Sequence, residues 1–255
     1  MTRATTGLVA SAVCSAVGLW GAPAAAAIGP VRRLLTPRLA GRGDPGHVAL
    51  TFDDGPERLS TPRFLEELDG LGVRATFFVL GARVARSPDL ARDIVAGGHE
   101  LGVHGWDHRC VALRGPGAAV ADLVRARDLI TSTTGVAPRW YRPAYGVATF
   151  PVLRAAVRVG LSPVLWTDWG RDWVTGATPA SVAGTAVGHL RGGAVLLLHD
   201  APAGRAGSDA WRVTLEALPA IVAHCRASAL AVGPLREHGV RQSRGRDRRP
   251  PPSMI

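Results

Sequence analysis

The most constraining feature of this chain is the regular alternation of short apolar runs with helical segments that begins at His47. The runs are continuous rather than alternating, which is typical of strands buried on both faces of a parallel sheet. Helix-starting pairs such as Thr61-Pro62 and Ser87-Pro88 lie between them. The pattern predicts strands over residues 47–52, 75–80, 100–103, 140–141, 164–167, 194–198 and 230–232, and helices over 61–70, 87–97, 120–130, 152–159, 178–190 and 211–226.

Repeated strand–helix units of this kind predict a single α/β domain over residues 47–239. We expect a TIM-like barrel of six to eight parallel strands with the helices on the outside. A doubly wound open sheet is the alternative. No glycine-rich phosphate loop follows the first apolar run, which disfavours the nucleotide-binding form of that alternative.

The N-terminus has the organisation of a secretory signal. Arg3 precedes an apolar stretch over residues 7–20, and the small residues 24–27 complete an Ala-x-Ala cleavage pattern. We expect a signal peptide over residues 1–27, with an uncleaved anchor as the alternative, and a linker over 28–46. The mature chain is then secreted or associated with the cell envelope. In that compartment, Cys110 and Cys225 either pair or remain two separate thiols.

The formal net charge of +10 is carried by arginine, because the chain has no lysine. Five of the arginines lie in the last fifteen residues, beside a run of prolines. This composition predicts a disordered basic tail over residues 240–255. The other arginines are spread over predicted helices with acidic neighbours, so we expect no nucleic-acid partner.

Seven polar residues lie at or just beyond the carboxyl ends of predicted strands. In a barrel these ends converge on one face, where the loops build the active site. Residues far apart in the sequence would therefore meet in space. They are Asp53, Asp54, His104, His108, Arg142, Asp172 and His199.

Two histidines and a carboxylate suggest a metal site. The three residues between His104 and His108 let both imidazoles reach one ion, and one of the adjacent aspartates, Asp53 or Asp54, can face it. The neighbouring carboxylate points to the other side of an extended chain and has a different role. The alternatives are a surface Asp-Gly turn and a histidine pair with no ligand role, and Asp107 competes as a ligand by position.

His199 ends a buried apolar run and is suited to act as a general acid. Asp172 is a candidate partner that raises the pKa of this imidazole, and Arg142 is a candidate partner of Asp53. Ordinary ion pairs are the alternative for both. Five tryptophans lie beside these polar sites and predict either a sugar-stacking groove, with Trp106 in the substrate site, or core packing. They are Trp106, Trp140, Trp166, Trp169 and Trp173.

Taken in order, five segments resemble the motifs of the polysaccharide deacetylases of carbohydrate esterase family 4. The resemblance runs from about residue 47 to 239 and implies a distorted (β/α) barrel. It implies that Asp54, His104 and His108 bind a divalent metal, with Asp53 as catalytic base and His199 as acid. The segments are 51–56, 104–108, 142–146, 168–173 and 197–199.

Further roles are implied by the same resemblance. Arg142 would orient the base and Asp172 would tune the acid, while the backbone N–H of Tyr145 would help to hold the oxyanion. Trp173 would wall the pocket, and Leu197 would contact the acetyl methyl group.

Two positions depart from the family pattern. Gly105 stands where the family usually has serine or threonine, and the absent hydroxyl braces the loop rather than binding the metal. Metal binding should therefore survive, with a looser or differently selective site. Ala144 replaces a frequent proline, which we expect to matter little.

The sequence thus predicts a monomeric hydrolase that removes N-acetyl groups from an amino-sugar polymer, either peptidoglycan or a chitin-type oligosaccharide. The expected metal is zinc, with cobalt or nickel as alternatives, and no stable protein partner is implied. The rival functions are an acetyl-xylan esterase or a small-molecule amide hydrolase on the same fold. A non-catalytic glycan-binding module is a further rival.

Overall fold

The computed structural model describes residues 39–110, 115–202 and 207–240. In this part of the chain, eight strands join one sheet, and every strand pair is parallel. The strands are β1 (His47–Asp53), β2 (Thr76–Val79), β3 (Glu100–Val103), β4 (Trp140–Tyr141), β5 (Ser162–Pro163), β6 (Asp168–Trp169), β7 (Val195–His199) and β8 (Ala231–Gly233).

The order of the strands is β5-β4-β3-β2-β1-β7-β6, with β1 near the centre. One side of β1 pairs with β7, and the other side pairs with β8 along its first half and with β2 along its second half. No strand pair joins β5 to β6 among the described residues, so the curled sheet is open at that seam. The fold is the predicted distorted (β/α) barrel.

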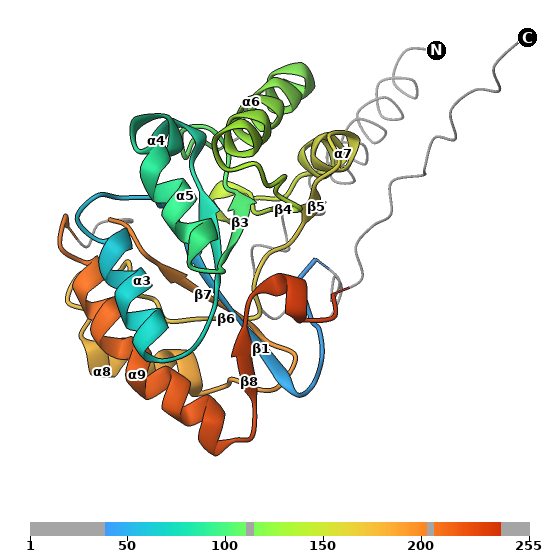
Figure 1. The fold of residues 1–255 in the computed structure, drawn as a ribbon. Coiled ribbons are helices and arrows are strands. Elements are labelled where there is room, and N and C mark those ends of the chain that lie inside the picture. Colours follow the sequence, from blue (N-terminus) through green and yellow to red (C-terminus); the bar gives the residue numbers. More distant parts are fainter. Residues whose placement is uncertain (1–38, 111–114, 203–206, 241–255) are drawn as a thin grey trace, which may run out of the picture.

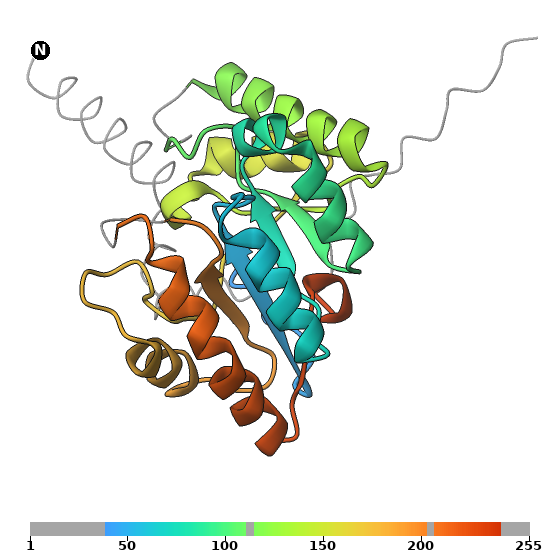
Figure 2. The ribbon, with the colours of Figure 1, turned by 60° about the vertical axis from the view of Figure 1, so that its left-hand side comes forward.

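Helices cover the outer face of the curled sheet (Figures 1 and 2). Proline at the first turn marks the start of several of them, because its missing N–H has no partner to lose there. The helices are α3 (Thr61–Gly70), α4 (Gly81–Arg86), α5 (Pro88–Ala96), α6 (Pro116–Thr134), α7 (Phe150–Arg158), α8 (Pro179–Val187) and α9 (Trp211–Ala227), with 3-10 turns η3 (Ala144–Gly146) and η4 (Leu235–Glu237).

Two apolar clusters lie on the two faces of the sheet. The larger one contains Leu50 and Phe52 of β1 and packs between the sheet and the helices. The smaller one contains Ala49 of β1 and Leu197 of β7 and fills the inside of the barrel. Because side chains alternate along a strand, Asp53 shares the inner face with Ala49. The carboxyl end of β1 therefore places a carboxylate at the mouth of the barrel.

The strands β5 and β6 and the helix α4 differ from the sequence prediction. Residues 164–167 form no strand, because their backbone N–H groups change partners: Val164 donates to Tyr141 O on the β4 side, and Thr167 donates to Val195 O on the β7 side. This segment crosses the open seam instead of extending one edge. The six-residue helix α4, which begins at Gly81, was not predicted.

The folded domain begins earlier than the predicted boundary at His47. Leu165 N donates a 2.7 Å hydrogen bond to Leu39 O, and Ala40 is fully buried. The described end of the predicted linker is thus part of the barrel. The predicted signal peptide and nearly all of the predicted basic tail lie outside the described residues. Within the described ranges, no helix is long and apolar enough to cross a membrane.

The two cysteines of the domain are separate thiols rather than a disulfide. Cys110 is half-buried on the loop after β3, whereas Cys225 is buried in α9. The pairing that the sequence left open is therefore absent.

Candidate active site

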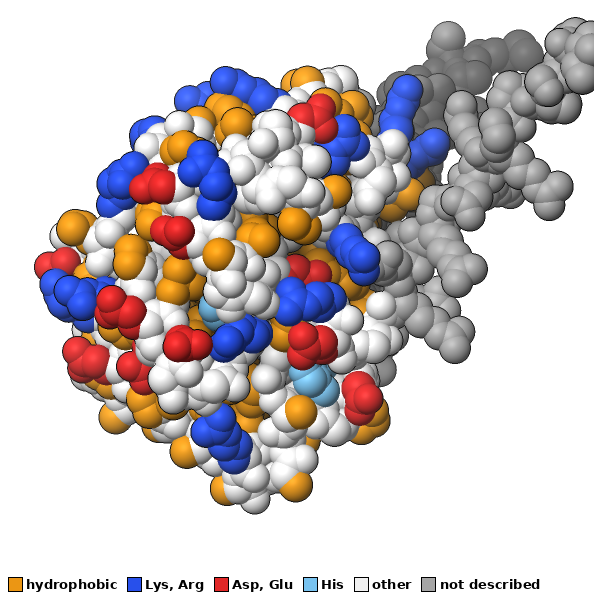
Figure 3. Space-filling view, in the orientation of Figure 1, with side chains coloured by type: hydrophobic (Ala, Val, Ile, Leu, Met, Phe, Trp, Pro, Cys, Tyr) orange, Lys and Arg blue, Asp and Glu red, His pale blue; other side chains and the backbone are white. Residues whose placement is uncertain are grey.

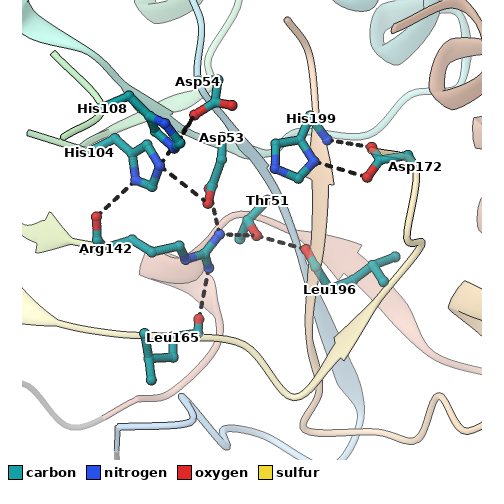
Figure 4. Close-up of polar contacts among 10 residues, drawn as sticks. All are labelled: Thr51, Asp53, Asp54, His104, His108, Arg142, Leu165, Asp172, Leu196 and His199. Atoms are coloured by element: carbon teal, nitrogen blue, oxygen red, sulfur yellow. Dashed lines mark hydrogen bonds and ion pairs between the residues drawn. The ribbon is translucent and has the colours of Figure 1, made fainter. Parts of the chain in front are cut away.

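The adjacent aspartates at the end of β1 point in different directions, as the sequence predicted, although Asp53 Oδ2 also lies 3.9 Å from His104 Nε2. Asp53 is the last residue of the strand. Asp54 has a left-handed backbone with φ of 79°, which turns its side chain away from the strand. Its Oδ1 atom lies 3.3 Å from His104 Nε2 and 3.1 Å from His108 Nε2 (Figure 4).

His104 is oriented by the neighbouring strand. Val103 and Tyr141 are register partners in β3 and β4, so the residues that follow them, His104 and Arg142, also meet. His104 Nδ1 lies 2.8 Å from the carbonyl oxygen of Arg142. A carbonyl only accepts, so Nδ1 carries the hydrogen, and in the neutral ring Nε2 has the lone pair that faces Asp54. This is the tautomer that a metal ligand requires.

The geometry of this trio fits a metal ion. The ligand atoms of Asp54, His104 and His108 all lie within 4.8 Å of one another. Metal–ligand distances of about 2.0–2.2 Å place the ligands of a tetrahedral site about 3.3–3.6 Å apart, close to the separations of 3.3 and 3.1 Å from Asp54 Oδ1. That oxygen is buried and has no hydrogen-bond partner. A buried carboxylate oxygen needs a cation or a donor, so the donor set favours a bound divalent metal.

Arg142 fixes the second carboxylate from inside the barrel. Its Nη1 donates to Asp53 Oδ1 at 2.7 Å and to Thr51 Oγ1 at 2.8 Å, and its Nη2 donates to Leu165 O at 2.8 Å (Figure 4). The Thr51 hydroxyl in turn donates to Leu196 O. Arg142 is fully buried and lies over the Phe78 ring. The guanidinium thus occupies one oxygen of Asp53 and leaves Oδ2 for other contacts.

His199 forms a second ion pair at the end of β7. Its Nδ1 lies 2.9 Å from Asp172 Oδ1, and its backbone N–H donates to Asp172 Oδ2 at 2.8 Å. Thr214 Oγ1 of α9 also donates to that oxygen, at 2.8 Å. Burial alone lowers the pKa of the imidazole, but the carboxylate outweighs burial and raises this pKa to about 9. His199 is therefore protonated at neutral pH, with Nε2 as the available proton donor.

The two ionisable groups meet at the same level of the barrel mouth. Asp53 of β1 and His199 of β7 are register partners in adjacent parallel strands. Adjacent strands lie about 4.8 Å apart, and partnered residues share a face of the sheet. A carboxylate and an imidazolium therefore stand side by side next to the trio (Figure 4). This arrangement suits proton transfer to and from one bound group.

Known proteins share this fold. Residues 40–164 match the family model described as polysaccharide deacetylase. A chitooligosaccharide deacetylase from Bradyrhizobium is 38% identical over 154 residues, which cover 60% of this chain and 70% of that protein. The chain belongs to the polysaccharide deacetylase family.

Other members extend the comparison. A peptidoglycan-N-acetylglucosamine deacetylase from Bacillus cereus is 31% identical over 157 residues, which cover 62% of this chain and 57% of that protein. The structure of a family 4 carbohydrate esterase from Streptomyces lividans in complex with acetate matches with a TM-score of 0.67 and 32% identity, over 74% of this chain and 93% of that one. As a member of this deacetylase family, the chain is a hydrolase that acts on carbon–nitrogen bonds other than peptide bonds.

The remaining predicted residues of this deacetylase lie at different distances from the centre. Tyr145 is exposed, has a left-handed backbone, and places its ring 4.6 Å from the His108 ring. Trp173 packs edge-on against His199, with ring centroids 5.4 Å apart. Leu197 is buried on the inner face of β7, two residues before His199. Tyr145 therefore borders the proposed metal ligands, and Trp173 borders the proposed acid.

The Trp106 ring packs against residues of α4 and α6. A Cβ atom on Gly81 would come within 2.6 Å of its indole, and the guanidinium of Arg125 lies 3.4 Å from its ring centroid. The structure does not bring this ring to the trio, and its predicted place in the substrate site stays a prediction.

Three polar residues of the site were not assigned from the sequence. Thr51 lies inside a recognised segment, so its contact with Arg142 could have been suspected. Thr214 lies in the middle of α9 and carries no local signal. Asp200 follows His199, accepts a 2.6 Å hydrogen bond from Thr61 Oγ1, and has its pKa raised by burial to about 7. A side chain on Gly55 would collide with it, so this buried carboxyl group packs directly under the loop after β1.

Proposed function

We propose that this protein is a metal-dependent N-deacetylase of amino-sugar polymers that releases acetate. One observation carries the proposal: a base candidate and a protonated acid candidate, Asp53 and His199, occupy partnered positions beside a trio of metal-ligand type. A binding module has no need of both. Hydrolysis of an amide needs both, because water must lose a proton while the departing amine gains one.

Each residue has a defined task in this reaction. Asp54, His104 and His108 would hold the metal, which when bound lowers the pKa of water and polarises a carbonyl group. Asp53, held through Oδ1 by Arg142, takes a proton from the attacking water. The backbone N–H of Tyr145 stabilises the oxyanion. His199 protonates the departing nitrogen, and acetate and a free amino sugar result.

Zinc is the proposed metal, with cobalt and nickel as the alternatives. Two imidazole nitrogens and one carboxylate oxygen are a recurrent donor set of catalytic zinc sites, which leave the remaining positions open to water and substrate.

The proposed substrate is the N-acetylglucosamine of peptidoglycan or of chitin-type oligosaccharides. The named relatives act on these two polymers.

We further propose that the protein is an exported, monomeric enzyme of the cell envelope. Arginines and acidic residues are equal in number among the described residues, so the whole net charge of +10 belongs to the remaining segments. On the face shown in Figure 3, basic and acidic side chains are interspersed, as a domain without a nucleic-acid partner would have them.

Acetate release from defined substrates tests the proposal. The full chain is incubated with peptidoglycan, chitin oligomers and acetylated xylan, each with and without added Zn²⁺. We expect zinc-dependent acetate release from one or both amino-sugar polymers. The Asp54→Ala and His104→Ala variants should lose both acetate release and metal binding. Release from acetylated xylan alone would identify an esterase. Glycan binding without turnover in metal-loaded protein, or full activity in either variant, would overturn the proposal.

A further inference from the structure

The loop from His104 to His108 carries both imidazole ligands, yet it contains glycine at its second position. Gly105 has a φ of 105°, which side chains rarely tolerate. A Cβ atom built on Gly105 would lie 3.4 Å from Asp122 Oδ2. Glycine therefore gives the loop a conformation in which a carboxylate from another element approaches its backbone.

Two helices hold the peptide groups of this loop. The N–H groups at the start of α4, those of Gly81 and Ala82, donate to Gly105 O at 3.0 Å and to Trp106 O at 2.8 Å. From α6, Asp122 Oδ2 accepts a 3.0 Å hydrogen bond from Trp106 N. Asp122 is buried, with 7% of its surface exposed. The peptide groups of Gly105 and Trp106 are thus anchored on two sides, immediately after the first metal ligand.

The contact from α6 differs in kind from those of α4. A carboxylate that accepts from a backbone N–H makes a charge-assisted hydrogen bond, which is shorter and stronger than a neutral one. It reaches the loop from a helix that supplies no ligand. Arg125, one turn further along α6, covers the Trp106 ring and so holds the same residue by its side chain.

We propose that Asp122 is a positioning residue of the metal site, which acts through the Trp106 N–H to set the separation of His104 Nε2 and His108 Nε2. The inference rests on the proposed metal-dependent function. Asp122 itself touches neither metal nor substrate. Glycine at position 105 has no side chain that could hold the loop in place. Asp122 of α6 holds the loop instead, through its hydrogen bond with Trp106 N.

Metal affinity of the full-length protein tests this role. Zn²⁺ affinity is measured by competition with a chelator, and the visible spectrum of the Co²⁺ form reports ligand geometry. For Asp122→Ala we expect about 10–100-fold weaker Zn²⁺ binding, the usual cost of losing a residue that orients a metal ligand, and an altered Co²⁺ spectrum. Asp122→Asn keeps an accepting oxygen and should fall between wild type and Asp122→Ala.

Asp128→Ala is the matched control, because Asp128 is an exposed acid on the same helix and pairs with Arg127. It should leave both readouts unchanged. Thermal unfolding of the metal-free variants separates a loss of folding from a loss of positioning, and the isosteric Asp122→Asn serves if Asp122→Ala does not fold. Wild-type Zn²⁺ affinity and Co²⁺ spectrum in a folded Asp122 variant would overturn the inference, whatever its thermal stability. A wild-type protein that binds Zn²⁺ without releasing acetate would instead refute only the proposed function.

Discussion

Histidines at the two ends of the barrel have opposite protonation states. At the amino end of β1, His47 Nδ1 lies 2.8 Å from His238 Nδ1, and burial lowers the pKa of both, that of His238 to about 4. At the carboxyl end of β7, His199 is paired with Asp172 and has its pKa raised to about 9. The first pair shares a hydrogen bond between neutral rings, whereas His199 carries a proton to donate.

The difference shows that burial of a polar group alone does not identify a site. Glu100 at the amino end is also buried, but its two oxygens accept from Trp140 Nε1, Thr76 Oγ1 and Arg236 N. Asp54 at the carboxyl end has an oxygen with no such donor. At the carboxyl end, carboxylates lie against imidazoles, and one oxygen of Asp54 has no hydrogen-bond donor. At the amino end, both oxygens of Glu100 have donors.

The largest expected effect comes from removing the base. Asp53→Asn keeps the shape of the side chain but cannot take a proton, so kcat for acetate release should fall about 10²–10⁴-fold. Glu100→Gln is the corresponding change at the amino end and should lower stability while leaving kcat within a few-fold of wild type. Acetate release at saturating substrate measures both. Equal losses of kcat in the two variants would show that the two ends do not differ in the way proposed.

Asp172→Asn should make His199 resemble the histidines at the other end. The wild-type acid is protonated below its pKa of about 9, so activity should be lost as the pH rises through that value. Without the carboxylate, the pKa should fall to about 6.5 or lower, which lowers the protonated fraction at pH 8 about 30-fold. The same pair contributes stability that is fully present below about pH 6.5 and is lost as the pH rises through about 9. The pH profile of kcat and an NMR titration of His199 measure the shift; an unmoved alkaline limb would exclude His199 as the acid.

At the amino end, a substitution should change stability and leave catalysis intact. His238→Gln leaves His47 without its ring partner, which should cost about 1–2 kcal/mol of unfolding free energy. Because the folded pKa of His238 lies below the unfolded value, wild-type stability should fall as the pH is lowered from about 6.5 to about 4, and the variant should lose part of this slope. Urea unfolding at several pH values measures both effects. A large loss of kcat in the folded variant would contradict a structural role.

Much of the fold could be predicted because the apolar runs are continuous. The predicted strand over 100–103 coincides with β3, and the runs of β1 and β7 were placed within one residue at either end. Residues 164–167 were assigned wrongly because local pattern cannot show that a segment changes hydrogen-bonding partners midway. Helix α4 was missed because six residues carry too little periodicity.

The residues of the site also fall into those that the sequence pattern could predict and those that it could not. Residues at strand ends were found, because the barrel brings the carboxyl ends of its strands together. Asp122 and Thr214 were not found, because each lies in the middle of a helix and contacts the site only through tertiary packing. Their surroundings in the sequence do not distinguish them from solvent-facing polar residues.

Thr214→Val should produce the smallest effect, and it should move His199 in the direction opposite to Asp172→Asn. The variant keeps the side-chain shape but removes the hydroxyl that donates to Asp172 Oδ2. A carboxylate that accepts one hydrogen bond fewer attracts the imidazole proton more strongly, so the alkaline limb should move slightly upward. If loss of this hydrogen bond weakens the positioning of His199 by about 1 kcal/mol, kcat should fall about fivefold. Thr185→Val, an exposed threonine on α8, is the control. A downward shift of the limb would mean that Thr214 supports the Asp172–His199 pair by packing alone.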